Sequence, residues 1–356
     1  MKILFWIEPV IEMERPFGKQ GWADYFSYKL IRALQNSVRA HEVECYFAIN
    51  EAIHQVFEEL PKIPRIVFTQ NELLKPFKDY LEAGIAWFNG TYTTAQLTYY
   101  QNLVREKLGG VVPDVIITFS PAPFLQTAFP RACLLYHEYS LFSRAPFPET
   151  WYFDPVGMNG SAYMTKYHDA IFSRLVLTPV QERRVDEFKR QCRELLTAKD
   201  PFREVMAAHQ SRFKQMALLP LMVSGTYTFD AYFPYKNQFQ FLTDILDKLP
   251  GAIGLVVTTH PDYDILDDYK LTYLRRKYPN FIYEPSFSEY YASSQFLIRY
   301  VDIVINATST IGLHTLVWDK KLICLTPRYF GFLGDAATVE DLPAVLEQPL
   351  RDRRKY

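Results

Sequence analysis

Two strand-like runs in the second half of the chain end in side chains that can hold a phosphate, and the first ends in a histidine. The run Leu255–Thr259 leads directly into His260 and Pro261. Because the proline fixes the chain just after the run, the imidazole is directed toward the strand end. There it can donate a hydrogen bond to a phosphate or to a leaving-group oxygen. The alternative is a loop histidine that bonds within the protein.

The second run, Ile303–Asn306, leads into Thr308, Ser309, Thr310 and Gly312, and a helical pattern follows. Hydroxyls and free backbone N–H groups at a helix amino terminus form an anion site without a lysine or glycine-rich phosphate motif. Ser and Thr are also common N-caps, so a plain cap is the alternative. The glycine favours a ligand, because it permits close approach to the backbone.

A third polar strand end lies at Asp230. We expect a strand over Leu219–Ser224, so the aspartate is predicted on a loop over the same sheet edge as His260 and Ser309. Parallel strands end at one edge, and the three side chains can therefore converge. A carboxylate beside a sugar anomeric carbon can act as nucleophile or stabilise an oxocarbenium-like transition state. An Asx-turn or a helix cap is the alternative.

In the first half of the chain, the strand-like run Ala132–Tyr136 is followed closely by Glu138. A strand-end carboxylate that faces a cleft between two domains suits an acid/base partner for an acceptor hydroxyl. We prefer Glu138 to Glu149, because Glu149 lies in a proline-rich loop with more freedom. Arg144 and Asp154 lie near this loop in sequence and complete the expected acceptor-side group.

Near the amino terminus, Gly21 lies between a first expected strand, Lys2–Ile7, and an expected helix, Tyr25–Leu34. A glycine at this point lets the backbone approach an acceptor, and an ordinary βα connection is the alternative. His137 and His168 lack metal-ligand spacing, and no cluster of His, Cys and acidic residues indicates a metal. We therefore expect neither a metal nor a cofactor.

Composition restricts the class of protein. The chain has 356 residues, of which 49% are hydrophobic, enough for two cores. A formal net charge of −1, from 39 basic and 40 acidic residues, gives no reason to expect a nucleic-acid partner. The four cysteines lack CxxC spacing, as in a reduced cytoplasmic protein. The amino-terminal apolar run is too short for a signal peptide, and no stretch is apolar enough to span a bilayer.

Strand-like runs alternate with helical patterns throughout, which is typical of a doubly wound α/β fold. The strands expected in the first of two sheets are Lys2–Ile7, Val43–Ile49, Arg65–Phe68, Asp114–Phe119 and Ala132–Tyr136. Those expected in the second are Leu219–Ser224, Gly254–Thr259, Phe281–Tyr283, Asp302–Asn306 and Lys321–Leu325.

A charged helical segment from Pro179 to about Met216 separates the two sets of strands. Its thin apolar stripe runs through Val185, Phe188, Cys192 and Leu195, as in a surface or bridging helix pair. We therefore expect a Rossmann-like acceptor-side domain over 1–178 and a helical connection over 179–216. A Rossmann-like nucleotide-sugar domain over 217–335 and a C-terminal helix and tail over 336–356 follow.

At these residues the chain resembles the GT-B glycosyltransferases of capsule and O-antigen polysaccharide synthesis, in particular the retaining β-Kdo transferases. The resemblance extends roughly from Ala132 to Leu325. It rests on Gly225–Asp230 with Lys236 and Gln238, on His260-Pro261, on Ala307–Gly312, on His137-Glu138 and on Glu149–Gly157. The sequence departs from the pattern at Thr226, because the related capsule enzymes tend to carry a glutamine ahead of the aspartate.

The resemblance implies a GT-B fold, in which two Rossmann-like domains face a central cleft. The His-Pro and Ser/Thr pair is also similar to what CMP-sugar-dependent sialyltransferases use for the cytidylate phosphate, which implies CMP-Kdo as donor substrate. Asp230 is then the nucleophile of a double displacement, with Glu138 as acid/base and His260 at the phosphate. The other donor-side residues are Pro261, Glu284, Thr308, Ser309, Thr310, Gly312, Lys236 and Gln238; the acceptor-side residues are Gly21, Arg144, Glu149 and Asp154.

The function expected on this basis is transfer of Kdo, with retention, from CMP-β-Kdo to a bacterial surface glycan of the lipopolysaccharide, O-antigen or capsule type. The rivals are an inverting GT-B transferase with another nucleotide sugar, a sugar-nucleotide epimerase, and a binding protein of similar fold. The expected partners are the donor and a free or lipid-linked glycan acceptor. We expect the chain in the cytoplasm, free or peripherally on the inner membrane. Both a chain that works alone and a module of a larger multi-transferase chain fit the sequence.

Overall fold

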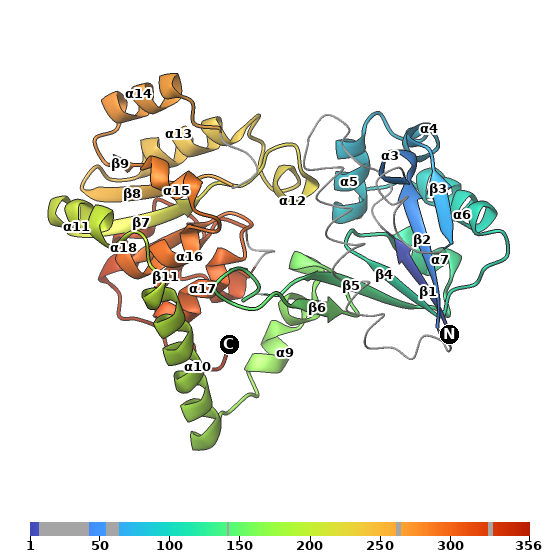
Figure 1. Ribbon diagram of the computed structural model, residues 1–356, viewed down its shortest axis with the longest axis horizontal. Helices are drawn as coiled ribbons and strands as arrows, with labels where there is room; N and C mark the ends of the chain where they lie inside the picture. Colours follow the sequence, from blue (N-terminus) through green and yellow to red (C-terminus); the bar gives the residue numbers. More distant parts are fainter. Residues whose placement is uncertain (7–42, 55–63, 141, 261–264, 327–329) are drawn as a thin grey trace. The chain divides into compact units, whose positions relative to one another are not determined.

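The computed structural model describes residues 1–6, 43–54, 64–140, 142–260, 265–326 and 330–356. The chain forms two compact units that alternate along the sequence. The first unit contains Met1–Glu138, Tyr152–Met158 and Thr226–Ala231, and the second contains Tyr139–Trp151, Asn159–Gly225 and Tyr232–Tyr356. Each unit is built on its own sheet (Figure 1). Gly21, Pro261 and the expected helix Tyr25–Leu34 lie outside the described residues.

The sheet of the first unit has the strand order β3-β2-β1-β4-β5-β6. Its strands are β1 (Lys2–Trp6), β2 (Glu44–Asn50), β3 (Arg65–Phe68), β4 (Val115–Thr118), β5 (Cys133–Tyr139) and β6 (Trp151–Asp154). The first five pair in parallel. Because helices cover a parallel sheet on both faces, the central strands are continuous apolar runs.

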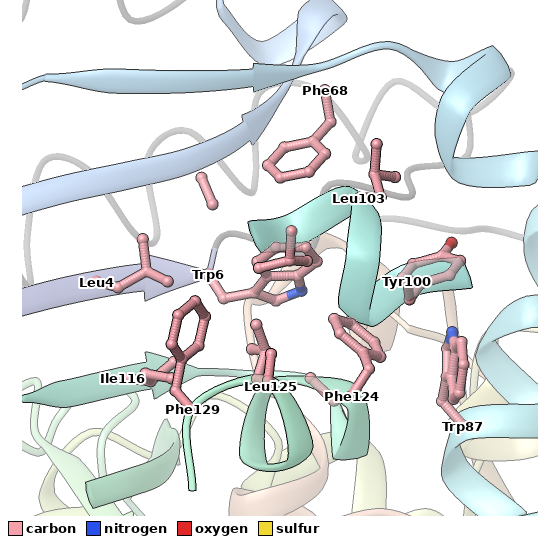
Figure 2. Packing of buried hydrophobic residues seen from close by; sticks show 14 of the residues in the cluster. Leu4, Trp6, Phe68, Trp87, Tyr100, Leu103, Ile116, Phe124, Leu125 and Phe129 are labelled. Atoms are coloured by element: carbon pink, nitrogen blue, oxygen red, sulfur yellow. The ribbon is translucent and has the colours of Figure 1, made fainter. Parts of the chain in front are cut away.

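Aromatic side chains fill the core of the first unit (Figure 2). The Trp6 ring lies edge-on to Phe68 and Phe124, with centroids 5.3 and 5.2 Å apart. Trp87 and Tyr100 meet in the same way at 5.0 Å. The helices that the structure describes in this unit are α3 (Glu51–His54), α4 (Gln70–Leu74), α5 (Tyr80–Asn89), α6 (Thr94–Leu108), α7 (Pro123–Ala128) and α12 (Tyr227–Asp230).

The sheet of the second unit is parallel throughout, with the strand order β11-β10-β7-β8-β9. Its strands are β7 (Gln215–Pro220), β8 (Ile253–Thr258), β9 (Phe281–Ile282), β10 (Ile303–Asn306) and β11 (Lys321–Cys324). Its α-helices are α8 (Tyr163–Lys166), α9 (His168–Phe172), α10 (Pro179–Ala198), α11 (Arg203–Arg212), α13 (Gln238–Lys248), α14 (Asp268–Lys277), α15 (Pro285–Glu289), α16 (Ser294–Leu297), α17 (Ile311–Trp318) and α18 (Leu342–Glu347).

The expected fold class is confirmed, because both units are α/β with parallel, Rossmann-like sheets. One expectation about a strand is wrong. The strand placed at Leu219–Ser224 is β7, which ends at Pro220; beyond it the Met222 N–H donates to the Gln238 side chain at 3.0 Å. No strand was predicted where β6 lies. The expected domain limits and the central cleft stay predictions.

The helical segment is confirmed as α10 and α11, but its apolar stripe is displaced. Phe188 and Leu195 are 47% and 45% exposed, whereas Cys192 and Leu196 are buried. Lys189 is buried as well, because Asp319 pairs with its ammonium group. The buried face of α10 is therefore rotated by about one residue from the expected stripe.

Candidate functional site

The strand order of the second sheet indicates where a ligand can bind. β7 lies between β8 and β10. The chain adds β8 and β9 on one side of β7 and then returns to add β10 and β11 on its other side. In open parallel sheets, ligands bind beyond the carboxyl ends of the strands at such a reversal. The residues at this position are those that follow β7 and β10.

Two buried polar side chains lie at the end of β10. Asn306 is 0% exposed, and in the described structure neither its Oδ1 nor its Nδ2 has a hydrogen-bond partner. Thr308 is 6% exposed, and its Oγ1 is also unpaired there. Leaving such a group unsatisfied costs roughly 1–3 kcal/mol, and buried polar groups in native proteins usually have a partner. A ligand at the reversal point would supply one.

The backbone around Asn306 is fixed by the neighbouring strand. The Leu325 N–H donates to the Asn306 carbonyl at 2.9 Å, and the Thr326 hydroxyl donates to the Ala307 carbonyl at 2.8 Å. These bonds leave the Asn306 carboxamide unused. The backbone of the site is therefore held in place, while the Asn306 carboxamide has no hydrogen-bond partner in the described structure.

The first turn of α17 combines a capping role with the predicted anion site. Ser309 Oγ accepts from the Ile311 N–H at 3.3 Å, and the Ser309 carbonyl accepts from Gly312 N–H at 3.3 Å. Thr310 occupies the N-cap position and makes no side-chain capping bond. Ser309 thus behaves partly as the plain cap that was the alternative. The Ser309 hydroxyl can still donate its own proton to a ligand, as can the hydroxyls of Thr308 and Thr310.

Gly312 has a different steric role from the one expected. A Cβ atom at this position would lie 2.8 Å from Asn306 Nδ2 and 3.1 Å from Asn306 Cγ. The close approach that glycine permits is therefore made by the Asn306 carboxamide, which lies directly against the first turn of α17. Any ligand contact of Gly312 itself stays a prediction.

Hydroxyl pairs hold the end of β8, where His260 follows. Thr258 Oγ1 and Ser294 Oγ are 2.7 Å apart, and Thr259 Oγ1 and Ser288 Oγ are 3.0 Å apart. His260 itself is half-buried. Because β8 is parallel to β7 and β10, His260 lies at the same sheet edge as Thr308. This is the part of the predicted donor site that one unit brings together.

Of three further residues predicted on the donor side, two have side-chain contacts within the protein and the third is exposed. Glu284 Oε1 lies 2.8 Å from His209 Nε2. Gln238 is 0% exposed, accepts from Met222 N–H and donates to Ser224 Oγ at 3.3 Å, which fixes the segment after β7. Lys236 is exposed ahead of α13. Their contact with a donor stays a prediction.

Asp230 lies at the end of the short helix α12 and not on a loop. This segment belongs to the first unit, where the Tyr227 ring packs on Gly84; a Cβ atom at Gly84 would lie 3.0 Å from Tyr227 Cδ1. The Tyr227 hydroxyl lies 3.4 Å from Ser120 Oγ. The Asp230 Oδ2 atom is buried. Since His260 belongs to the second unit, the convergence of Asp230 with it stays a prediction.

The residues around β5 and β6 differ in their contacts. Glu138 is half-buried on β5 and lies near Tyr152, whose pKa is raised by burial and then by Glu138 and Asp154. Asp154 is 7% exposed and accepts from the N–H groups of Val156 and Gly157 at 2.7 and 3.0 Å. Asp154 therefore closes a turn, and an acceptor contact of this residue stays a prediction.

Arg144 and Glu149 belong to the second unit, whereas we expected them in the first domain. The Arg144 guanidinium lies over the Tyr139 ring, 4.0 Å from its centroid, and donates to Ser143 Oγ at 3.0 Å. Burial raises the pKa of Tyr139, and the nearby Glu149 carboxylate raises it further. Glu149 is exposed, in keeping with the freedom expected of its loop.

Sequence reasoning missed Asn306 as a site residue, because it ends a run expected to be a buried strand. The available signal was an amide at a strand end, a position where a buried polar side chain needs a partner.

In the described part of the chain, no His, Cys, Asp and Glu side chains gather as a set of metal ligands. Nor does any described helix have the length and apolar character needed to cross a membrane.

Residues 181–341 match the family described as capsule polysaccharide biosynthesis protein. The match confirms the expected capsule-type resemblance. It contains all five strands of the second sheet, including the end of β10 and helix α17. The side chains of Asn306 and Thr308 therefore lie within the part of the chain that matches this family.

Among solved structures, the chain is similar to a β-Kdo 2,7 transferase, KpsC from Thermosulfurimonas dismutans, at 16% identity and a TM-score of 0.45, over 77% of this chain and 83% of that one. The β-Kdo 2,4 transferase of KpsC is 15% identical with a TM-score of 0.42, over 68% of this chain and 78% of that one. UDP-GlcNAc 2-epimerase from Methanocaldococcus jannaschii is 12% identical with a TM-score of 0.34, over 99% of this chain and 94% of that one. No curated protein sequence matches the chain significantly. Similarities this low assign no activity to it.

Proposed function

We propose that this chain is a glycosyltransferase of capsule-type polysaccharide synthesis, which transfers Kdo from CMP-β-Kdo to a bacterial surface glycan with retention. The observation that carries the proposal is that two buried side chains, Asn306 and Thr308, have no hydrogen-bond partner in the described structure. They lie at the reversal point of the second sheet, within the residues that match the capsule family. This is where α/β sheets of this kind bind nucleotides.

The donor phosphate is assigned to the edge between β8 and β10. Departure of CMP leaves a phosphate monoester whose negative charge grows in the transition state. The amino terminus of α17, the Thr308 and Thr310 hydroxyls and a protonated His260 would each favour that charge. The Asn306 carboxamide can donate to one ligand oxygen and accept from a ligand hydroxyl.

Retention requires two inversions at the anomeric carbon. In the first, an Asp230 oxygen forms a bond to that carbon as the bond to the CMP oxygen breaks, giving a glycosyl ester. In the second, Glu138 takes the proton of an acceptor hydroxyl, whose oxygen then displaces the Asp230 carboxylate. The mechanism requires the two units to bring Asp230 to the donor.

The test is to incubate the purified chain with CMP-Kdo and measure CMP release with and without glycan acceptors, then determine the anomeric configuration of the product by NMR. Acceptor-dependent CMP release with a β-Kdo product supports the proposal. An α-Kdo product would instead show that the chain inverts the anomeric configuration of its donor. CMP binding without release in the presence of every acceptor would point to a binding protein. Turnover of a UDP-sugar without transfer would point to an epimerase.

A further inference from the structure

One segment of the second unit, residues 163–184, exposes both apolar and basic side chains. Six of its hydrophobic side chains are exposed: Tyr163, Met164, Tyr167, Leu175, Val176 and Val180. Four exposed cationic side chains are interspersed with them: Lys166, Arg174, Arg183 and Arg184. We call this set the 163–184 surface. It has no part in the donor site described above.

The inner side of this segment is anchored to the body of the unit. Phe172 on α9 is buried, and its ring lies 4.7 Å from Tyr356 and 5.8 Å from Phe332. His168 stacks on Phe332 at 5.0 Å. The segment is therefore held by its inner aromatic residues, while its outer side chains are left in solvent.

The most exposed of these apolar side chains lies between α9 and α10. Val176 is 85% exposed, and the adjacent Leu175 is 37% exposed. On α8 and just after it, Tyr163 and Tyr167 form an exposed pair with ring centroids 5.2 Å apart. Scattered exposed apolar residues are common, but several of them gathered in one segment of the chain together with cationic side chains are typical of an interaction site.

The charge of this region differs from that of the chain. Residues 163–184 carry four Lys or Arg and two acidic residues, whereas the whole chain has a net charge of −1. The C-terminal residues 351–356 add four Lys or Arg and one acid, and the Tyr356–Phe172 contact places this end beside α9. One of the acidic residues, Glu182, lies 3.7 Å from Arg354. The region is therefore cationic.

We propose that the 163–184 surface docks the second unit peripherally on an anionic lipid bilayer. Val176 and Leu175 would enter the apolar boundary of the lipids, and the tyrosines suit the headgroup level. The lysine and arginines would contact anionic headgroups. A soluble polyanion gives no reason for exposed valine and leucine. A second copy meeting the same surface would bring like charges together. The inference does not depend on the donor or on the reaction.

The experiment is sedimentation of the full chain with vesicles of phosphatidylglycerol and phosphatidylethanolamine, compared with phosphatidylcholine vesicles. We expect binding to the anionic vesicles that weakens as salt is raised. Val176→Asp and the double variant Arg183→Glu/Arg184→Glu should each lower the bound fraction at a fixed lipid concentration by about ten-fold. Tyr269→Asp is the matched control, because Tyr269 is 89% exposed on α14 of the same unit.

Circular dichroism of each variant verifies that it is folded. The proposal is overturned by absence of sedimentation, by equal binding to the phosphatidylcholine vesicles, or by equal losses in the Tyr269 variant. It is also overturned if Val176→Asp instead dissociates a dimer of the free protein, or if only the arginine variant loses binding, as a polyanion site would. CMP release with a soluble acceptor should be unchanged in Val176→Asp, so membrane docking and the proposed reaction are tested separately.

Discussion

At the end of β10 the Asn306 carboxamide is enclosed by protein, yet within the described structure nothing bonds to it. A purely structural asparagine would have partners there, and its loss would destabilise the fold. An asparagine reserved for a ligand behaves in the opposite way, because the free protein already carries the cost of its desolvation. Affinity and stability therefore distinguish the two roles.

We predict that Asn306→Leu weakens CMP binding by about ten-fold or more, the loss of one or two hydrogen bonds, while the ligand-free protein is no less stable. Leucine has a similar volume without polar atoms. Gly312→Ala should weaken CMP binding too, because its Cβ would lie 2.8 Å from Asn306 Nδ2. Isothermal titration calorimetry and thermal unfolding measure the two effects. A less stable Leu variant with normal CMP affinity would contradict the ligand role.

Asp230→Asn tests the proposed nucleophile. The amide cannot form the glycosyl ester, so we expect CMP-Kdo binding to be largely intact and transfer to fall by about 10³-fold or more. Glu149→Gln is a matched control: it should transfer normally if Glu138 is the acid/base, whereas Glu138→Gln should not. Near-normal transfer by the Asp230 variant would show that the nucleophile lies elsewhere. The readouts are ligand titration and acceptor-dependent CMP release.

The sequence predicted Ser309, Thr310 and Gly312 at a helix start, and the structure places Gly312 in the first turn of α17, Thr310 at its N-cap and Ser309 just before it. It could not predict how the capping bonds would be divided, which depends on the exact start of the helix. The sequence did not indicate Asn306 as a site residue, because a polar residue at the end of an apolar run is counted as part of the expected strand. Its environment is set by α17, which lies later in the chain.

At the scale of elements, the apolar runs located the strands well, because both faces of a parallel sheet are buried. The end of β7 was misplaced because the side chain of Gln238, on α13, takes the N–H of Met222. The buried face of α10 was misplaced because a lysine lies in it. A buried charge is unexpected unless its partner is known, and Asp319 is distant in sequence.

Helices α10 and α17 are joined by that partner. Asp319, in the left-handed conformation at the carboxyl end of α17 (φ 51°), pairs with Lys189 and Arg193 of α10. Arg193 also donates to the Val317 carbonyl at 2.6 Å. Through these bonds α10 holds the helix whose other end forms the candidate site.

We predict that Asp319→Asn lowers the free energy of unfolding of the second unit by roughly 1–3 kcal/mol, because Lys189 loses its anion in a buried position. The value is kept at this level because Asp319 is partly exposed. Asparagine still tolerates the left-handed backbone. Lys189→Met should be less costly and should rescue the Asp319 variant in the double mutant. Denaturant titration measures all three, and additive losses would contradict the coupling.

At the scale of the whole molecule, two parallel sheets could be predicted from two sets of apolar runs. Which segments of the chain belong to which unit could not be predicted. Residues 139–151 pack with the second unit, although the segments before and after them belong to the first. Residues 226–231 pack with the first unit, although the segments on both sides belong to the second. For the second of these segments one contact stands out: the Tyr227 ring fits against Gly84, where a side chain would be crowded. Such long-range complementarity leaves no periodic signal in a sequence.

The first unit contains a buried titratable group that predicts its response to acid. His137 is 0% exposed between the rings of Phe119 and Phe153, and burial lowers its pKa to about 3. Between about pH 6.5 and pH 3 the unfolded chain binds a proton at this site and the folded chain does not. The free energy of unfolding should therefore decrease as the pH is lowered through that window, by at most about 1.4 kcal/mol per pH unit from this group. Above the window the contribution of this group to stability is fully present.

Replacement of this histidine should flatten the response. We expect His137→Phe to make the free energy of unfolding of the first unit less dependent on pH between about 6.5 and 3, since phenylalanine binds no proton. His168→Gln is the control, because its side chain is 35% exposed and it lies in the second unit. Denaturant titrations at several pH values measure the slope. An unchanged slope in the His137 variant would mean that acid acts on the first unit through other groups, chiefly its carboxylates.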